Sequence, residues 1–314
     1  MKPIPFVTLD QPSYGRPLDV SPLIRRVIAE NPSKFTYHGT GTYIVGHGDV
    51  AVIDPGPLLD SHRDALAAAL DGERVRAILV THCHADHSPL AAWLREVTGA
   101  PTVAFGPHVR ADAEERDEDI DDDADDDRAE VKIEESTDYA FDPDARVADG
   151  EIAALGPGWT LRAVHTPGHT SNHLCFALDE EHALFTGDHI MGWSTTVISP
   201  PDGDMRAYLS SLHAVRRRSD AVLWPTHGAP VPDPGPFIDA YIAHRLEREA
   251  QVLAAVRAGT AQIKPMVKQL YANVDTKLHK PAARSVLAHL VKLVDDGLVV
   301  ADGAIGLKAT FYPA

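Results

Sequence analysis

Residues 78–88 read Ile78-Leu79-Val80-Thr81-His82-Cys83-His84-Ala85-Asp86-His87-Ser88, and this stretch decides the fold. Its apolar start is typical of a buried strand, and the polar residues that follow include four potential metal ligands. Side chains two residues apart on an extended backbone point the same way, so His82, His84 and Asp86 can face one space. His87 joins them if the chain turns there. Proline is favoured in the first turn of a helix, and Pro89 follows at once. The stretch is therefore predicted to be a strand-to-helix loop that aims ligands into a cleft.

Three histidines and one aspartate within six residues indicate a metal centre. Imidazole nitrogens with a carboxylate suit zinc, iron or manganese, whereas calcium prefers oxygen ligands. A lone histidine would be better interpreted as a surface residue or a hydrogen-bonded core residue, but the density of this cluster argues against that alternative. Cys83 alternates with its histidine neighbours, so we expect its thiol to point away from the ions and to pack in the interior.

The composition is that of an ordinary globular protein. A length of 314 residues predicts about two domains, and 44% apolar residues suffice for their cores. The two cysteines, Cys83 and Cys175, cannot form a disulfide framework, which favours a reducing compartment. The sequence has no apolar run of the length of a signal peptide or a membrane span. We therefore expect a cytoplasmic location and no membrane partner.

The net charge of −17 is unevenly distributed along the chain. Residues 112–135 contain 15 acidic and three basic residues, a run that cannot bury a core of its own. We interpret this acidic insertion as solvated surface in preference to a regulatory or cation-collecting segment. The chain as a whole offers no basic footprint for nucleic acid.

Strands and helices alternate in two successive sets after an N-terminal stretch, residues 1–31, that is expected to wrap the surface. The first set is predicted as strands at 35–37, 42–45, 50–54, 76–80 and 101–105, with helices at 60–70, 89–98 and near 107–113. The second set is predicted as strands at 146–148, 151–154, 160–165, 173–178, 183–186 and 221–224, with a helix at 204–217. Two sheets packed face to face with helices on both outer faces would accommodate this order.

The pattern changes near residue 237, which divides the chain into a predicted catalytic domain, 1–236, and a C-terminal module, 237–314. Helices are predicted at 237–258, 263–271 and 281–296, followed by a hairpin of 298–301 with 305–310. Three helices and a hairpin suggest a winged helix. The helix at 281–296 offers only Arg284, His289 and Lys292 as bases, whereas a helix that reads DNA is usually richer in them. A structural lid or a homodimer contact is therefore the preferred interpretation of the module.

Three further apolar runs end in polar residues next to glycine, as the first stretch does. They lead into His165-Thr166-Pro167-Gly168-His169-Thr170, Thr186-Gly187-Asp188-His189 and Pro225-Thr226-His227-Gly228. Glycine at such ends lets the backbone approach a site closely. One such strand end would be a weak signal, but four in one chain indicate a common site.

Together these motifs resemble the metallo-β-lactamase superfamily over about residues 40–248. Residues 81–87 fit its H-x-H-x-D-H signature, and the three later motifs follow in the family's order. His244-Arg245-Leu246-Glu247-Arg248-Glu249 and the helical tail are similar to the β-lactamase-like-protein-2 branch. Ser88 stands where many relatives have glycine, and the acidic insertion is not part of the general pattern.

The resemblance implies an α+β fold, a four-layer αββα sandwich with two divalent metal ions in a cleft at one edge. One ion would be held by His82, His84 and His169, the other by Asp86, His87 and His227, and Asp188 would bridge them. Zinc is the expected metal, with manganese or iron(II) as alternatives. A pair of ions acidifies a shared water to a hydroxide that can attack a carbonyl carbon without a serine or cysteine nucleophile. Asp86 and Asp188 would therefore serve catalysis as well as metal binding.

Several other polar residues have two plausible roles. Asp54 either orients a ligand or caps a turn. His173 either protonates the leaving group, which would make it catalytic, or makes a structural hydrogen bond. His165 and His189 are expected at most to support the ligands, and Trp193 either lines the substrate cleft or packs.

The leading functional hypothesis is a metal-dependent hydrolase of a small-molecule lactam, lactone, ester or thioester. The acidic surface would repel polyanions, which makes a single-strand endoribonuclease the second choice, even though a hydroxide between two ions attacks phosphorus as readily as carbon. A third hypothesis, from another class, is a DNA-binding regulator that uses the C-terminal module.

Overall fold

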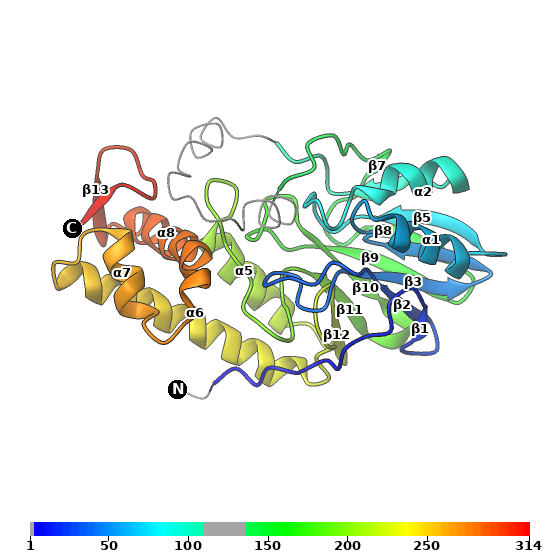
Figure 1. Ribbon diagram of the computed structural model, residues 1–314, viewed down its shortest axis with the longest axis horizontal. Coiled ribbons are helices and arrows are strands. Elements are labelled where there is room, and N and C mark those ends of the chain that lie inside the picture. The colour runs from blue at the N-terminus through cyan, green and yellow to red at the C-terminus, as the bar shows by residue number, and fades with distance from the viewer. Residues whose placement is uncertain (1–2, 110–135) are drawn as a thin grey trace.

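Two β-sheets pack face to face in the larger part of the molecule, on the right in Figure 1. The structure is a computed structural model that describes residues 3–109 and 136–314. The acidic insertion at 112–135 lies outside the described residues. The first sheet contains, in spatial order, β1 (Leu18–Asp19), β2 (Ile24–Ile28), β3 (Gly41–His47), β4 (Asp49–Ile53), β5 (Arg74–Leu79), β6 (Thr102–Ala104) and β7 (Ala145–Arg146). The second has the order β12 (Val222–Pro225), β11 (Ala183–Gly187), β10 (Leu174–Leu178), β9 (Trp159–His165) and β8 (Ile152–Gly156).

Helices cover the outer face of each sheet. Helices α1 (Asp60–Ala69) and α2 (Leu90–Thr98) pack on the first sheet, where they share an apolar cluster with β4 and β5. Helices α5 (Met205–Arg216) and α6 (Pro234–Arg257) share a second cluster with β10, β11 and β12. The expected four-layer αββα sandwich is confirmed.

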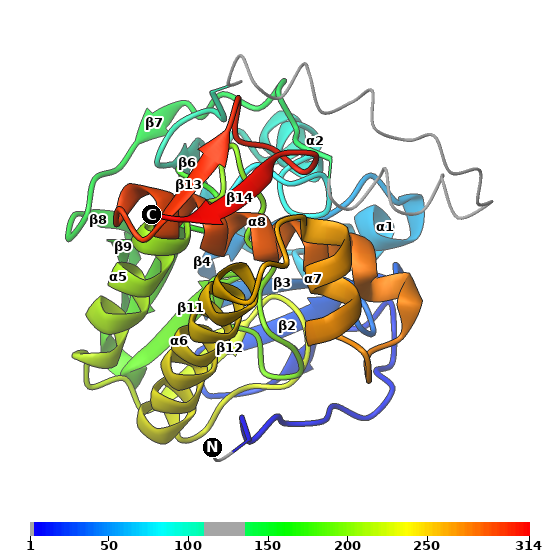
Figure 2. The same ribbon diagram turned by 90° about the vertical axis from the view of Figure 1, so that its left-hand side faces the viewer.

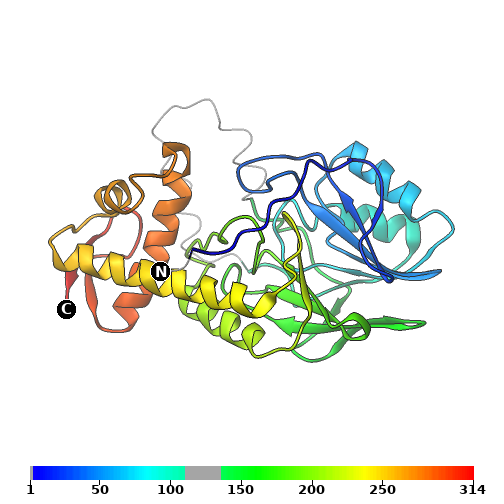
Figure 3. The same cartoon turned by 90° about the horizontal axis from the view of Figure 1, so that it is seen from below.

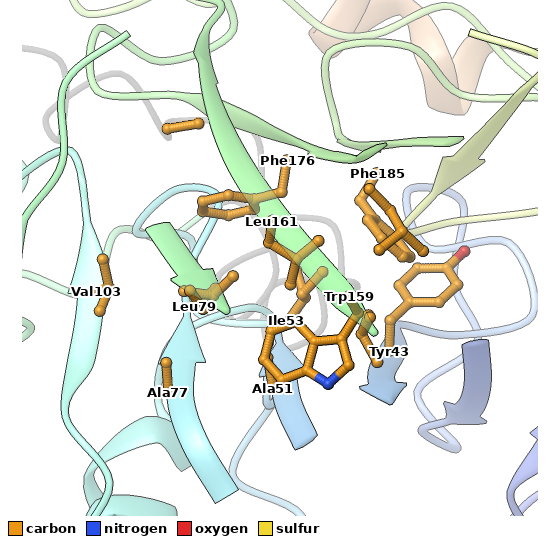
Figure 4. Packing of buried hydrophobic residues seen from close by; sticks show 14 of the residues in the cluster. Tyr43, Ala51, Ile53, Ala77, Leu79, Val103, Trp159, Leu161, Phe176 and Phe185 are labelled. Carbon is orange, nitrogen blue, oxygen red and sulfur yellow. The ribbon is translucent and has the colours of Figure 1, made fainter. Parts of the chain in front are cut away.

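The core between the sheets is built on alternating residues, such as Trp159, Leu161 and Ala163 along β9. Figure 4 shows Trp159 and Leu161 among their neighbours in this core. Trp159 is 1% exposed and donates its indole N–H to the carbonyl oxygen of Asp49 at 2.9 Å. Glycine is required beside this ring, because a Cβ at Gly46 or Gly156 would collide with it. The indole therefore joins β9 to the first sheet and fixes the distance between the sheets.

Two parallel strand pairs determine where the site forms. β4 pairs in parallel with β5 in the first sheet, and β11 pairs in parallel with β12 in the second. The carboxyl ends of parallel neighbours lie at the same edge of a sheet, so the loops that leave β5, β11 and β12 can meet there.

The C-terminal module forms a separate apolar cluster. It contains α7 (Ile263–Leu270), α8 (His279–Asp295) and a hairpin of β13 (Val299–Asp302) with β14 (Thr310–Pro313) (Figure 2). Helix α6 spans both bodies (Figure 3). Its first half packs Phe237 and Tyr241 against the second sheet, and its second half packs Val252 and Val256 in the module. A boundary at residue 237 remains a prediction, since this helix begins at Pro234 and continues through both clusters.

Several expected elements differ from the structure. Residues 35–37 form turns with one isolated bridge, not a strand, and Tyr37 has φ +60°, which an extended strand does not allow. The expected helix near 107–113 is absent over 107–109, and its remainder lies outside the described residues. The second strand of the last hairpin is β14, not 305–310. The N-terminal stretch also contributes β2, an inner strand that pairs with β1 and β3.

Within the described parts of the chain, no helix is long and apolar enough to cross a bilayer.

Replacing Trp159 with alanine should destabilise the fold by about 3–5 kcal/mol, because it leaves a cavity between the sheets and unpairs the Asp49 carbonyl. Urea unfolding followed by circular dichroism measures the change. The neighbouring Leu155 is 61% exposed, so Leu155→Ala is the control and should change stability by less than about 0.5 kcal/mol. Equal losses in the two variants would contradict the role given to the indole.

Candidate metal centre

All seven predicted ligands lie together at the edge where the strand ends meet. His82, His84, Asp86 and His87 occupy the loop between β5 and α2. His169 lies between β9 and β10, Asp188 directly follows β11, and His227 follows β12. Three groups have ligand atoms within 4.8 Å of one another: His82 with His84 and His169, His82 with His87 and Asp188, and Asp86 with His87 and His227. The sequence reasoning thus selected residues that the fold brings into one cluster.

In the first group, three ring nitrogens face each other. His84 Nδ1 lies 2.9 Å from His82 Nε2 and 3.2 Å from His169 Nε2. His169 Nδ1 lies 2.7 Å from the carbonyl oxygen of Val197, which can only accept, so Nδ1 carries the proton and Nε2 presents its lone pair to the group. Such a tautomer is what a metal-binding histidine requires.

The second group combines carboxylates with imidazoles. Asp86 Oδ2 lies 3.2 Å from His227 Nε2 and 3.4 Å from His87 Nε2. Asp188 lies between the two groups, with Oδ1 3.4 Å from His227 Nε2 and Oδ2 3.8 Å from His169 Nε2. His87 Nε2 and Asp188 Oδ1 are buried, lie 3.6 Å apart and have no hydrogen-bond partner. Buried orphan atoms of this kind, in a set of nitrogen and carboxylate donors, fit divalent transition-metal ions.

The charges of the two groups differ. Burial, together with the neighbouring histidines, holds the pKa of His82 well below its usual range and lowers that of His84 to about 3. Burial would also lower the pKa of His227, but Asp188 and Asp86 outweigh it and raise the value to about 10. The pKa of His87 is likewise raised well above its usual range, against burial, by Asp86, Asp188 and Asp54. Without metal, the first group is neutral and the second holds protons.

Asp54 contacts a proposed ligand from the side away from the cluster, which agrees with the first of its two predicted roles, the orientation of a ligand. Its Oδ2 lies 2.9 Å from His87 Nδ1 and accepts from the hydroxyls of Thr81 (2.8 Å) and Thr226 (3.2 Å). Its Oδ1 accepts the backbone N–H of Thr81 at 2.8 Å. One carboxylate therefore connects the ends of β4, β5 and β12.

Two further supports were not anticipated from the sequence. Thr40 donates its hydroxyl to Asp86 Oδ2 at 2.9 Å. Arg26 on β2, only 4% exposed, donates to the carbonyl oxygens around His227: Gly228 at 2.7 Å, Thr226 at 2.8 Å and Pro225 at 3.3 Å. Gly41 makes room for the guanidinium, since a Cβ there would collide with Arg26 Nε. The apolar residues on either side of Arg26 could have indicated strand β2. The proline-rich sequence around them instead led to the expectation of an irregular segment.

Both ring nitrogens of His173 contact groups of the protein itself. Its Nε2 accepts the backbone N–H of Asp188 at 3.2 Å, its Nδ1 lies 2.8 Å from the Thr166 hydroxyl, and the ring is fully buried. Burial, with His189 and His169 nearby, also holds its pKa well below the usual range. Because both nitrogens are engaged, the geometry favours the structural alternative over the catalytic role expected for His173.

The remaining candidates lie around the cluster. His165 stacks on Phe105 with ring centroids 4.1 Å apart, and His189 is buried between His173 and Tyr208. Trp193 stacks on Tyr37 at 4.8 Å and presses against Gly228, so it packs beside the His227 loop.

The three bases expected on α8 all contact the chain itself or are buried. Arg284 donates to the Ser199 hydroxyl at 3.1 Å, and Lys292 binds Glu249 and Asp296 at 3.0 and 2.8 Å. His289 is fully buried. This arrangement does not favour DNA reading by α8.

Metal loading should depend on pH. At pH 7 His87 and His227 of a chelator-treated sample carry protons that must leave before these nitrogens can bind an ion. We therefore expect about two protons from the histidines per fully loaded chain, and up to about one more from a water that the ions acidify. Calorimetric zinc titrations in buffers of different ionisation enthalpy measure this number, which should fall as the pH approaches 10. Release close to zero at pH 7 would contradict the charge assignment.

The raised pKa of His227 also determines how the stability of the metal-free protein depends on pH. The pKa of His227 is raised to about 10 from an unfolded value near 6.5, so its contribution to stability is complete below about pH 6.5 and is lost as the pH rises through 10. Asp86 and Asp188, whose pKa values are lowered, contribute above about pH 4 and lose that contribution in acid.

Comparison with known proteins shows the families to which the two parts of the chain are similar. The family model described as metallo-beta-lactamase superfamily matches residues 37–227, and that of the beta-lactamase associated winged helix domain matches residues 263–307. The chain is 30% identical over 308 residues to an atrochrysone carboxyl ACP thioesterase of Aspergillus chevalieri, covering 93% of this chain and 87% of that protein. It is 27% identical to the lactamase-like protein ptaB of Pestalotiopsis fici, covering 93% and 86%.

Solved structures are similar over nearly the whole chain. A beta-lactamase domain protein from Burkholderia ambifaria has a TM-score of 0.76 at 21% identity, covering 96% of this chain and 95% of its own. A metallo-beta-lactamase family protein from Thermus thermophilus has a TM-score of 0.72 at 21% identity, covering 94% and 100%. At this identity the likeness shows the fold, and it includes the C-terminal module.

Proposed function

The chain belongs to the metallo-beta-lactamase superfamily and is a hydrolase, and from this premise we propose that it is a thioesterase that releases an acyl group from a carrier-bound thioester. The observation that carries the proposal is the convergence of seven ligands from four strand ends. The thioesterase of Aspergillus chevalieri supports the substrate class, because its similarity covers the module as well as the site. Zinc is the proposed metal, since the donor set combines imidazole nitrogens with carboxylates.

In this proposal His82, His84 and His169 would hold one ion, Asp86, His87 and His227 would hold the second, and Asp188 would be shared. Ions bound there supply an acidified water and positive charge against the carbonyl oxygen. The chain's own residues keep the ligands in position: Asp54 orients His87, and the Val197 carbonyl orients His169.

The substrate approaches one side of the cluster. The side chains of Asp188 and His169 are 13% and 9% exposed, whereas those of His87, His227 and Asp86 are 0%, 2% and 4% exposed. The accessible edge therefore lies at Asp188, His169 and the partly buried His84, whereas Asp86, His87 and His227 are closed to solvent.

The engagement of His173 favours a thioester over a lactam. In hydrolysis the water oxygen bonds to the carbonyl carbon, the bond to the leaving atom breaks, and a carboxylate remains. An amide nitrogen must be protonated as it leaves, whereas a thiol with a pKa of about 8.5 departs as the thiolate. A site whose candidate acid is occupied by Asp188 and Thr166 suits the substrate that needs no acid.

Hydrolysis can be tested with a short acyl thioester beside the oxygen ester of the same acyl group, nitrocefin and labelled single-stranded RNA. We expect the thioester to react at least about tenfold faster than the oxygen ester in kcat/KM, and chelator to abolish turnover. Release of free thiol, read with a chromogenic disulfide, measures the rate. Cleavage of RNA or nitrocefin with an inert thioester would overturn the proposal.

Asp188→Ala should reduce turnover by at least about 100-fold and lose at least one ion per chain, because both ion positions lose a ligand. Elemental analysis of the purified variant gives the metal content. Asp220 is a matched carboxylate away from the cluster, paired with Arg218 at 2.7 Å, so Asp220→Ala should keep its metal. A fully loaded and fully active Asp188→Ala variant would refute the shared ligand.

A further inference from the structure

The segment that follows β11, residues 188–199, has no regular secondary structure, yet it fixes two proposed ligands. It begins with Asp188, and the carbonyl oxygen of Val197 orients His169. Inside the segment, the Thr196 hydroxyl donates to the carbonyl oxygen of Asp188 at 2.7 Å. Asp188 and His169 also belong to the accessible edge of the cluster, and both positions depend on how this Asp188 segment is held.

Helix α6 holds the segment from the outside. The Tyr241 hydroxyl accepts the backbone N–H of Met191 at 3.3 Å and also contacts the carbonyl oxygen of Ser194. One turn further along, Arg245 donates from Nη2 to the carbonyl oxygen of Thr196. Arg284 on α8 reaches the end of the segment at Ser199. Two residues of α6 and one of α8 thus contact the segment at successive points.

Arg245 is a costly residue in this position. It is 3% exposed, its guanidinium carbon lies 5.3 Å from the ring centroid of Tyr208, and its Nε has no hydrogen-bond partner. The salt bridges among the described residues include no carboxylate partner for it. Burial of an ion costs several kcal/mol unless dipoles compensate. The Thr196 carbonyl and the Tyr208 ring supply that compensation, which fixes the Asp188 segment against α6.

From these contacts we infer that Arg245 is a positioning residue for the metal centre, and that helix α6, which connects the sandwich to the C-terminal module, acts through it as part of the framework of the active site. The path is short: Arg245 holds the Thr196 carbonyl, the Thr196 hydroxyl holds Asp188, and the next carbonyl, Val197, holds His169. Loss of the guanidinium would release two of the three ligands at the accessible edge, Asp188 and His169, together. The inference adds to the proposed function, but its measurement needs no substrate.

The test compares zinc affinity, measured by competition with a fluorescent chelator, in three variants. Arg245→Met keeps the aliphatic stem but removes charge and donors, and should weaken zinc binding by about 10–100-fold, the range for loss of a residue that orients a ligand. Arg245→Lys keeps a charge and one donor group and should recover part of the loss. Arg206→Met is the matched control. It removes an ion pair of 2.6 Å with Asp296, between α5 and the end of α8 but away from the segment, and should bind zinc as the unmodified protein does.

Wild-type zinc affinity in a folded Arg245→Met variant would overturn the inference, as would an equal loss in Arg206→Met. If circular dichroism shows that Arg245→Met does not fold, Tyr241→Phe takes its place. This variant removes one hydroxyl that holds the same segment and should weaken zinc binding several-fold, and an unchanged affinity would again refute the inference. The two proposals can fail separately. If the variants bind zinc more weakly but the unmodified protein hydrolyses no thioester, the proposed function is overturned and the positioning role stands.

Discussion

The carboxylate of Asp54 is the contact on which the rest of the site depends. Asp54 is fully buried, and its backbone has φ +50°. Its carboxylate binds Thr81 at the start of the loop after β5, His87, and Thr226, which precedes His227. These partners belong to both sheets. Two sheets joined only by apolar side chains could slide by a fraction of an ångström, whereas directional hydrogen bonds to one carboxylate fix their ends relative to each other. Metal ligands that come from different sheets can share an ion only if the sheet ends keep fixed positions relative to each other.

Electrostatics follow from the same arrangement. Asp54, Asp86 and Asp188 gather negative charge around His87 and His227, while the first group consists of imidazoles alone. A buried carboxylate is costly unless it is paired, so in the absence of ions the protons on the two histidines balance these charges. The cluster is thus stable as a protein interior and is also arranged to exchange those protons for cations. Arg26 and Arg245 add buried positive charge behind the ligand loops, where each binds backbone carbonyl oxygens.

The sequence predicted the parts of the site that local patterns encode. His82, His84, Asp86 and His87 share one loop, and His169, Asp188 and His227 each end an apolar run, so strand ends identified them. Arg26, Thr40 and Arg245 could not be found in this way, because each acts on a carbonyl or carboxylate distant in the sequence. Tyr37 was misassigned because an aromatic run favours a strand, while its positive φ is imposed by the turn. The role of His173 was open since two partners, not the residue itself, decide what its nitrogens do.

Helix α6 places a practical limit on how this enzyme can be divided. Its first half supplies Phe237, Ile238 and Tyr241 to the layer beneath the second sheet, and its second half supplies Val252 and Val256 to the module. A shortened protein cut after residue 227, where the sandwich motifs end, would leave that layer uncovered and prone to aggregate. The bend at Ala258 and Gly259, just beyond the helix, is no cleaner place to exchange modules between relatives, because Val252 and Val256 before it already pack in the core of the module.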